Sequence, residues 1–347
     1  MEKYLLSPDA SIKDALKQMD KVASKTLFVA RDNVLLGSIS DGDIRRAILR
    51  SISFDTKSSE IMNTSPFSLQ EGFDAEQAKK VMLEKRFEAI PVLNKQKRIT
   101  DILFWNQLLA NQKKEYKNLS DVPVVIMAGG KGTRLEPFTS IFPKPLIPFG
   151  NKTIIESIMD EYNKFNIGSF YISVNYKARL IKTYLEESIP NYSFQYIEEN
   201  IPLGTAGSLK LIADKVEKSF FVSNCDIIIK DDYAAIYDYH CNNNYDLTLV
   251  ASARHYTIPY GVVKFKKGGA LSSISEKPEF NFFVNTGMYI LKPEVLDLIP
   301  ANSFFHITNL INELSKNGGK VGVYPVSEKS WVDVGQWEEY NNALKEM

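Results

Sequence analysis

The stretch that most constrains the fold is VVIMAGGKGTRL, residues 124–135. Its apolar start predicts a strand that is buried on both faces, as strands of a helix-covered parallel sheet are. The strand opens at once into a turn with three glycines, Gly129, Gly130 and Gly132. Open α/β sheets bind ligands at the carboxyl ends of their strands, and glycines let several backbone N–H groups approach one anion. We therefore expect a phosphate site on this turn.

Two common glycine-rich phosphate motifs do not fit the turn. A P-loop needs Gly-x-x-x-x-Gly-Lys-Ser/Thr, but here a glycine follows the lysine and Val125 stands where the first glycine belongs. A dinucleotide fingerprint needs Gly-x-Gly-x-x-Gly, and Leu135 occupies the place of the third glycine. Arg134 is left as a forked phosphate donor, and Lys144 in FPKPLIP as a mobile point charge.

From Val122 onward, strand-like runs alternate with helical patterns. The runs that read as strands are PVVIMAG, SFYISV, FQYIEE, SFFVSNCDII, DLTLVAS, GVVKF, FVNTGMYIL and KVGVYPV. TIIESIMDEYNKF and KARLIKTYLEE read as helices between the early strands. This alternation predicts an α/β fold with a Rossmann-like, mixed and mostly parallel sheet that helices cover on both faces.

A weak internal repeat precedes that region, in residues 1–117. Its two copies lie roughly 60 residues apart. Each reads as a helix, a short strand (LFVA, AIPVL), a turn, a second strand (LLGSIS, KRITDI) and a closing helix, which is an α+β unit. The polar stretch NQKKEYKNLSD, residues 111–121, is the linker candidate. We place the boundaries at 1–117, 118–122 and 123–347.

The composition argues against several classes of protein. Lys plus Arg and Asp plus Glu number 42 each, so net charge favours neither nucleic acid nor an anionic membrane as a partner. Two cysteines make neither a disulfide framework nor a four-thiolate zinc site. The three histidines, His240, His255 and His306, lack metal-ligand spacing and read as structural. No apolar run has the length of a signal peptide or a membrane span, so we expect a cytoplasmic protein.

AGGKGTRLEPFT and PKPLIPFGNKTIIE resemble the signature of the sugar-1-phosphate nucleotidyltransferases. Further motifs follow in family order over residues 123–340: LGTAGSL, SNCDII, YGVV, SEKP, VNTGMYIL and WVDVGQWEEY. Each motif alone fits a turn or a helix cap, and their joint occurrence in order favours the enzyme. The resemblance implies a glycosyltransferase-A-like domain. LGTAGSL is worded most like the guanylyltransferases that make GDP-mannose.

The resemblance also implies roles for single residues. Catalysis is expected from Arg134, Lys144 and Asp226, and a Mg²⁺ cofactor is expected on Asp226 and Asp333. Nucleotide contacts, mostly through the backbone, are expected at Ala128, Gly129, Gly130, Gly132, Thr133, Leu203, Gly204, Thr205 and Gly207. Contacts to the sugar phosphate are expected at Gly261, Glu276, Lys277, Asn285 and Thr286.

The N-terminal half resembles a tandem pair of CBS domains, in which a Gly-x-Ile-Ser/Thr-x-x-Asp stretch can hold the ribose of an adenine nucleotide. The matching residues are Gly37, Ile39, Ser40 and Asp43, and we take Ser40 and Asp43 as candidate ligand contacts. The second copy has Thr100, but Leu103 stands where the aspartate would be. A scaffold or dimerisation module without a ligand is the alternative, and we expect a homo-oligomer.

The reaction that the resemblance implies is attack by a sugar-1-phosphate oxygen on the α-phosphorus of an NTP, with loss of pyrophosphate. GTP is the expected nucleotide, and uridylyl, cytidylyl or thymidylyl transfer is the alternative. A CBS pair ahead of such a domain resembles bacterial glucosamine-1-phosphate guanylyltransferases of legionaminic acid synthesis, which puts glucosamine-1-phosphate ahead of mannose-1-phosphate. An inactive nucleotide sensor is the alternative from another class, and the intact Arg134, Lys144, Asp226 and Asp333 argue against it.

Overall fold

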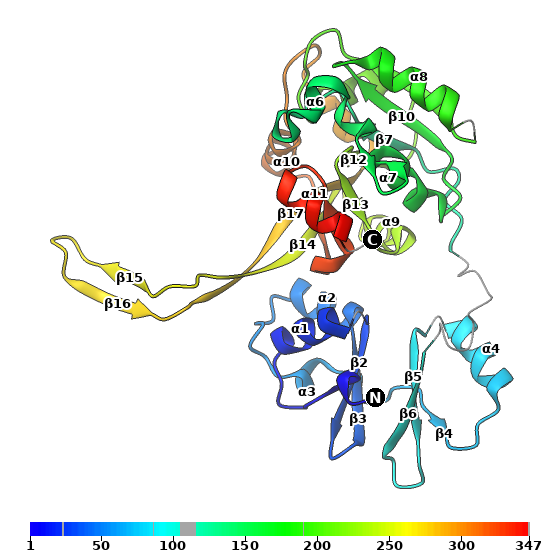
Figure 1. Cartoon of the computed structure of the whole chain (residues 1–347), viewed down its shortest axis with the longest axis vertical. Helices are drawn as coiled ribbons and strands as arrows, with labels where there is room; N and C mark the ends of the chain where they lie inside the picture. Colours follow the sequence, from blue (N-terminus) through cyan, green and yellow to red (C-terminus); the bar gives the residue numbers. More distant parts are fainter. Residues whose placement is uncertain (23, 86, 105–115, 190, 346–347) are drawn as a thin grey trace. The chain divides into compact units, whose positions relative to one another are not determined.

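The computed structural model describes residues 1–22, 24–85, 87–104, 116–189 and 191–345. The chain divides into two compact units, unit 1 (Met1–Glu115) and unit 2 (Tyr116–Met347), which Figure 1 shows in sequence colours. The expected closing helix of the second repeat and the first half of the expected linker lie outside the described residues. Within the described ranges, no helix has the length and apolar character that crossing a lipid bilayer requires.

Unit 1 contains two small sheets of the same design. Their strands are β1 (Leu5–Leu6), β2 (Thr26–Arg31) and β3 (Val34–Ser40), then β4 (Leu69–Gln70), β5 (Ala89–Leu93) and β6 (Ile99–Phe104). In each sheet a two-residue strand runs parallel to the middle strand, and the third strand is antiparallel to it. The helices are η1 (Glu2–Tyr4), α1 (Ile12–Val22), α2 (Asp41–Leu49), α3 (Ser58–Ile61) and α4 (Ala75–Lys85). The arrangement repeats as the sequence predicts.

Unit 2 is built on a sheet of seven strands in the order β11-β10-β7-β12-β17-β14-β18. The strands are β7 (Val124–Met127), β10 (Ser169–Val174), β11 (Ser193–Glu198), β12 (Phe220–Asn224), β14 (Leu247–Thr257), β17 (Glu279–Leu291) and β18 (Val321–Val326). Of these strands, β17 alone runs against its neighbours. The prediction of a mixed, mostly parallel sheet is therefore confirmed.

Helices cover both faces of the sheet. Because side chains alternate along a strand, Val124 and Ile126 of β7 point into one apolar core and Val125 into the other. The first core includes residues of α7 (Ile154–Asn163), α8 (Ala178–Ser188), α9 (Tyr233–Asn242) and α11 (Trp337–Lys345). The second includes residues of η4 (Gly207–Ile212), η5 (Pro293–Leu298) and α10 (Ile307–Lys316). Near-continuous apolar strands are what two buried faces require.

The run SFFVSNCDII forms two strands, where one was predicted. The chain turns at Cys225 and Asp226, and β13 (Ile227–Ile229) then leaves the central sheet to pair with β19 (Trp331–Asp333). The backbone N–H of Val334 donates to the carbonyl of Asp226 at 2.9 Å, which ties the turn to this second pairing. The sequence reading missed β19, and this small sheet turns out to carry the site.

Short elements complete unit 2. They are η2 (Thr133–Leu135), α6 (Phe138–Ile141), η3 (Lys144–Leu146), β8 (Pro148–Phe149), β9 (Lys152–Thr153), β15 (Val262–Phe265), β16 (Leu271–Ser275) and η6 (Glu328–Ser330). Most of them lie in the connections between the long strands, and η2, α6 and η3 follow β7 directly. The segment after the glycine turn is therefore folded into short helices, which fixes the positions of the side chains that it carries.

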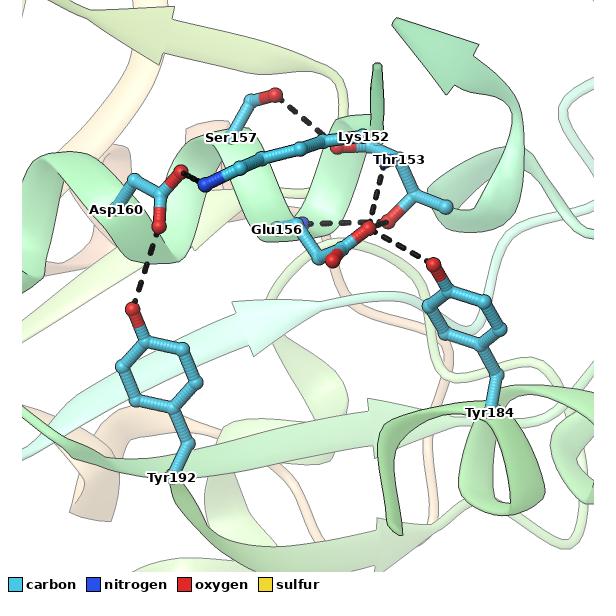
Figure 2. A network of polar contacts seen from close by, with 7 residues as sticks. All are labelled: Lys152, Thr153, Glu156, Ser157, Asp160, Tyr184 and Tyr192. Atoms are coloured by element: carbon cyan, nitrogen blue, oxygen red, sulfur yellow. Dashed lines mark hydrogen bonds and ion pairs between the residues drawn. The ribbon is translucent and has the colours of Figure 1, made fainter. Parts of the chain in front are cut away.

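A capping box fixes the start of α7, shortly after η3 (Figure 2). The hydroxyl of Thr153 accepts the N–H of Glu156 at 3.4 Å, and the Glu156 carboxylate accepts the N–H of Thr153 at 2.7 Å. The same carboxylate accepts the phenol of Tyr184 from α8 at 2.8 Å. One turn later, Asp160 pairs with Lys152 and accepts a hydrogen bond from Tyr192. The network therefore connects α7 to Lys152 on β9, to Tyr184 on α8 and to Tyr192, which precedes β11.

We expect Thr153→Ala to lower the free energy of unfolding of unit 2 by about 1 kcal/mol, because the N–H of Glu156 loses its acceptor. Calorimetric melting of the full chain measures the loss as a lower Tm of the transition of unit 2. Thr153→Ser is the matched control, since it keeps the hydroxyl. An alanine variant as stable as the wild type would contradict a stabilising role for this cap.

Candidate active site

Two residues that the sequence predicted for the site, and two polar residues that it did not single out, follow the ends of neighbouring parallel strands. Ala128 follows β7, Asn175 follows β10, Glu199 follows β11 and Asp226 lies two residues after the end of β12. Since these four strands are parallel, their carboxyl ends share one edge of the sheet. This is the edge where open α/β sheets bind their ligands.

The glycine turn leaves backbone donors uncovered. Gly132 has φ +69°, and a Cβ there would lie 2.9 Å from the Cβ of Lys144, so a larger residue is excluded by strain and by space. A Cβ on Gly130 would meet nothing within 4 Å. Among the described residues, no acceptor takes the backbone N–H groups of 129–134, which includes Thr133. These N–H groups are available to an anion.

Three charged side chains meet beside the turn. The ammonium of Lys144 pairs with Oδ2 of Asp226, and a guanidinium nitrogen of Arg134 lies 3.8 Å from the same oxygen. The side chains of Lys144 and Asp226 are only 7% and 13% exposed, whereas that of Arg134 is 63% exposed. Lys144 is therefore held in place, contrary to the mobile charge that the sequence suggested. Arg134 is the member with freedom to reach a ligand.

The small sheet β13–β19 brings Asp333 to Asp226. Ile227, next to Asp226 in the chain, is the register partner of Asp333. A Cβ built on Gly335 would lie 2.8 Å from Oδ2 of Asp226, 2.9 Å from Oδ1 of Asp333 and 3.2 Å from Nζ of Lys144. Three charged groups thus border the same small space, and only glycine leaves room for them.

Burial raises the pKa of Asp333 above its ordinary value. The N–H of Gly335, which donates to Oδ1 of Asp333 at 2.7 Å, opposes this increase in pKa. The negative charge of Asp226 raises the pKa further, and the positive charge of Lys144 lowers it. Two carboxylates this close need a cation nearby in order to ionise together.

The carboxylate pair fits a hard divalent cation. Oxygen ligands suit Mg²⁺, which is typically held by one or two carboxylates while water and phosphate oxygens fill its other positions. In the described part of the chain, no cluster of three or more His, Cys, Asp or Glu side chains forms a metal cage. Asp226 and Asp333 would therefore hold such an ion with positions left open for a phosphate.

Glu199 links the glycine turn to the loop at 203–207, and the sequence reading missed it. Its buried carboxylate accepts the hydroxyl of Ser173 and, at 3.0 Å, the N–H of Leu203. A Cβ on Gly129 would lie 2.7 Å from Oε1 of Glu199, so the glycine allows a close approach. The signal in the sequence that could have identified Glu199 was its position, four residues before the start of LGTAGSL.

The loop at 203–207 uses most of its polar groups to keep its shape. Gly204 has φ +79°, and a Cβ there would lie 2.7 Å from the carbonyl oxygen of Phe305. That oxygen accepts the N–H groups of Ala206 and Gly207 at 3.0 and 3.1 Å. The hydroxyl of Thr205 accepts the N–H of Ile307 at 3.0 Å, at the start of α10. The loop is thereby fixed at the same edge of the sheet as the glycine turn.

Two of the residues predicted for the sugar phosphate lie on β17. Thr286 is buried, and its hydroxyl donates to the carbonyl of Val250 at 2.8 Å. Asn285 is exposed, and its amide donates to the phenol of Tyr289 at 2.6 Å. A Cβ on Gly287 would lie 2.6 Å from Nδ2 of Asn224, so this part of β17 adjoins the end of β12. Asn285 is the better placed of the two for a ligand.

The other three residues predicted for the sugar phosphate lie apart from the carboxylates. Gly261 precedes β15, and Glu276 and Lys277 follow β16. A Cβ on Gly261 would lie 3.0 Å from Oε2 of Glu276, so these residues form one exposed group. Figure 1 shows β15 and β16 projecting away from the strands that carry the carboxylates. Within one copy, the structure does not bring this group to the site.

Ser40 and Asp43 of unit 1 form the capping box of α2. The hydroxyl of Ser40 accepts the N–H of Asp43 at 3.2 Å, and the Asp43 carboxylate accepts the N–H of Ser40 at 2.8 Å. Asp43 also pairs with Arg46. These contacts explain both residues as helix-capping groups, and their contact with an adenine nucleotide stays a prediction.

Family models match both parts of the chain. The model described as nucleotidyl transferase matches residues 123–347, and the model of the CBS domain matches residues 3–50 and 59–111. A mannose-1-phosphate guanyltransferase of Yarrowia lipolytica is 35% identical over 228 residues, which are 62% of this chain and 61% of that protein. The chain thus spans about three fifths of this relative's length.

Solved structures give a similar picture. The crystal structure of HddC from Yersinia pseudotuberculosis superimposes with a TM-score of 0.53 at 27% identity, covering 65% of this chain and 99% of that one. HddC complexed with GMP-PN superimposes with a TM-score of 0.52 at 26% identity, covering the same 65% and 99%. Both comparisons support the mixed α/β fold of unit 2.

We expect Asp333→Asn to raise the Tm of the metal-free protein at pH 7. An acid whose pKa is raised by folding binds more protons folded than unfolded, so its contribution to stability falls as pH rises above the ordinary pKa of Asp, about 3.9. The asparagine can keep the bond from Gly335 without that cost. Calorimetry in EDTA should show the gap between variant and wild type closing as pH falls to about 4.

Glu338→Gln is the matched control, because Glu338 is exposed on the neighbouring α11. Its Tm should follow that of the wild type across the same range. A gap for Asp333→Asn that does not change with pH would contradict the raised pKa.

Proposed function

The chain belongs to the nucleotidyl transferase family, and from that premise we propose that it transfers a nucleotidyl group from an NTP to a sugar-1-phosphate, releasing pyrophosphate. One observation carries the proposal. Lys144, Asp226 and Asp333 converge on the space beside Gly335, next to a glycine turn with uncovered N–H groups. This arrangement would provide positive charge and N–H donors, which offset the repulsion between two anionic phosphates when they approach each other.

The position of each group in the site suggests its role in the reaction. Uncovered N–H groups of the glycine turn would bind triphosphate oxygens. Arg134, which is exposed, would reach the departing pyrophosphate, and Lys144 would hold a fixed positive charge beside the α-phosphate. Mg²⁺, when bound by Asp226 and Asp333, supplies positive charge that offsets the repulsion between the two phosphates.

No general base is required for this chemistry. The attacking oxygen of a sugar-1-phosphate already carries negative charge at neutral pH. The barrier therefore falls mainly through alignment and electrostatic stabilisation. The site fits this requirement, because Lys144 and Asp226 hold each other in an ion pair and the β13–β19 pairing holds Asp333 next to them.

We propose GTP as the nucleotide. Support comes from the relative named mannose-1-phosphate guanyltransferase, from the GMP-PN complex of HddC, and from the wording of LGTAGSL. For the sugar we propose glucosamine-1-phosphate, a legionaminic acid precursor. The reason is the domain order, because a CBS pair precedes the transferase domain in this chain. Mannose-1-phosphate, which the relative's name suggests, is the second candidate.

The test is a matrix of GTP, UTP, CTP and dTTP against glucosamine-1-phosphate, N-acetylglucosamine-1-phosphate, glucose-1-phosphate and mannose-1-phosphate, read as pyrophosphate release with Mg²⁺. We expect the largest kcat/KM for GTP with glucosamine-1-phosphate. A maximum elsewhere in the matrix corrects the base or the sugar. No release in any combination would contradict the proposed function and favour a nucleotide-sensing protein.

We expect Asp226→Asn to lower kcat by about 10²-fold or more, because a preorganised charge at the reacting phosphates is lost. Arg134→Ala should change kcat in the same direction. Asp238→Asn is the control, since Asp238 pairs with Lys117 at the surface of unit 2. Wild-type pyrophosphate release from the Asp226→Asn protein in saturating Mg²⁺ would refute the role of this carboxylate.

A further inference from the structure

A two-stranded arm projects from the central sheet of unit 2 (Figure 1). We define the arm as residues 253–283. Strand β14 pairs with β18 only as far as Ser252, and beyond that residue it pairs with β17 alone. Farther out, β15 and β16 form a sheet of two strands. An isolated two-stranded hairpin is marginally stable in water, so such an arm calls for a partner surface.

One face of the arm is apolar and uncovered. Val263 lies opposite Ile274, and Phe265 lies opposite Leu271. These four side chains are between 50% and 71% exposed. Strand β15 has three apolar residues, and Lys264 separates Val263 from Phe265, so these two side chains lie on the same face of the strand. A single copy of the chain therefore leaves this apolar face unburied.

The apolar surface continues toward the sheet. Tyr256, Tyr260, Phe280 and Phe282 are each at least 46% exposed. Tyr256 and Phe280 are register partners on β14 and β17. Together with the four residues farther out, they form an extended apolar surface of the kind that marks a protein interface.

The charge of the arm favours the rest of a second copy, which we call its body, over a second arm as the partner of the arm. Residues 261–277 contain four lysines and one glutamate, so this part of the arm is positively charged. Because the whole chain has a net charge of zero, the remainder carries an equal negative excess. Two arms would repel each other, whereas the rest of a second copy carries the opposite net charge.

The body offers an apolar surface of its own beside the glycine turn. Phe138, Ile141 and Phe142, in and next to α6, are between 45% and 67% exposed, and we call them the α6 patch. The α6 helix is tied to the turn, since the hydroxyl of Thr139 donates to the carbonyl of Gly132 at 3.0 Å. Figure 1 shows that the arm projects away from α6 of the same unit.

We propose that two copies of this chain exchange arms, each arm packing its apolar face on the α6 patch of the other copy. Each copy then gives one arm and receives one, which closes a twofold dimer. Gly261, Glu276 and Lys277, at the base of the hairpin, come to the partner's glycine turn. The catalytic site is thus composite, with carboxylates from one copy and the Glu276–Lys277 group from the other. This inference rests on the proposed function.

The first test is the mass in solution. Wild type should be a dimer by sedimentation at micromolar concentration, and Phe265→Asp with Ile274→Asp should shift it to monomer. These side chains are exposed, so the fold of each unit should be kept, and circular dichroism checks this. Leu180→Asp on α8 is the control, because Leu180 is an exposed apolar residue outside the arm and the α6 patch. A monomeric wild type, or a dimer that the arm variant leaves intact, would overturn the proposal.

The second test is complementation between two inactive variants. One carries Asp226→Asn with a normal arm, and the other carries normal carboxylates with Glu276→Gln and Lys277→Ala. Co-expressed with different tags and purified as mixed dimers, they should regain about half of the wild-type activity per dimer, because one of the two sites receives all its residues. Each variant alone should stay at least about 10-fold below that level.

The outcomes separate the possibilities. Mixed dimers as inactive as their parents would show that each arm serves its own chain, and would overturn the exchange. An arm variant with full activity would overturn the composite site. If the wild type releases no pyrophosphate, the proposed function fails, while the sedimentation experiment still decides on the exchange of arms.

Discussion

Placing two carboxylates and an ammonium around one small space is the constraint on which the rest of unit 2 depends. Asp226 and Asp333 repel each other when both are ionised, and burial adds to that cost. Lys144 offsets part of it through its ion pair with Asp226. The β13–β19 pairing holds the two acids at this distance, and Gly335 leaves the space between them open. We therefore expect an added cation to bind there, because it would relieve the repulsion that folding imposes on the two carboxylates.

The fold positions this cluster with groups that take no part in the chemistry. Glu199 accepts hydrogen bonds from Ser173 and Leu203 and lies against Gly129, so one buried carboxylate connects the glycine turn with the loop at 203–207. Such a group would act through the backbone, because a shift of the glycine turn would move all the N–H groups that we propose for phosphate binding together.

The sequence predicted the sheet well and the site in part. Buried parallel strands such as VVIM are readable, because two covered faces require a continuous apolar run. Only the family resemblance predicted that Asp333 approaches Asp226. The strands β13 and β19 have three residues each, which is too short for a periodic pattern to reveal them. Glu199 was missed because a carboxylate in a polar run normally lies at the surface. GVVKF was predicted only as a strand, and its sequence does not say whether its apolar side chains are covered; the structure shows that Val263 and Phe265 are exposed.

Burial divides the site into parts with different tasks. Lys144 and Asp226 are nearly enclosed, so their geometry is the same for any phosphate that enters, and they suit the step common to all nucleotidyl transfers. Asn285, Glu276 and Lys277, the candidate contacts to the sugar phosphate, are exposed. Exposed groups can change without unfolding the core, so we expect discrimination between sugars to depend on these residues. If a second copy supplies part of that set, association of the chains also controls which sugar is accepted, and a change at the arm would alter specificity and assembly together.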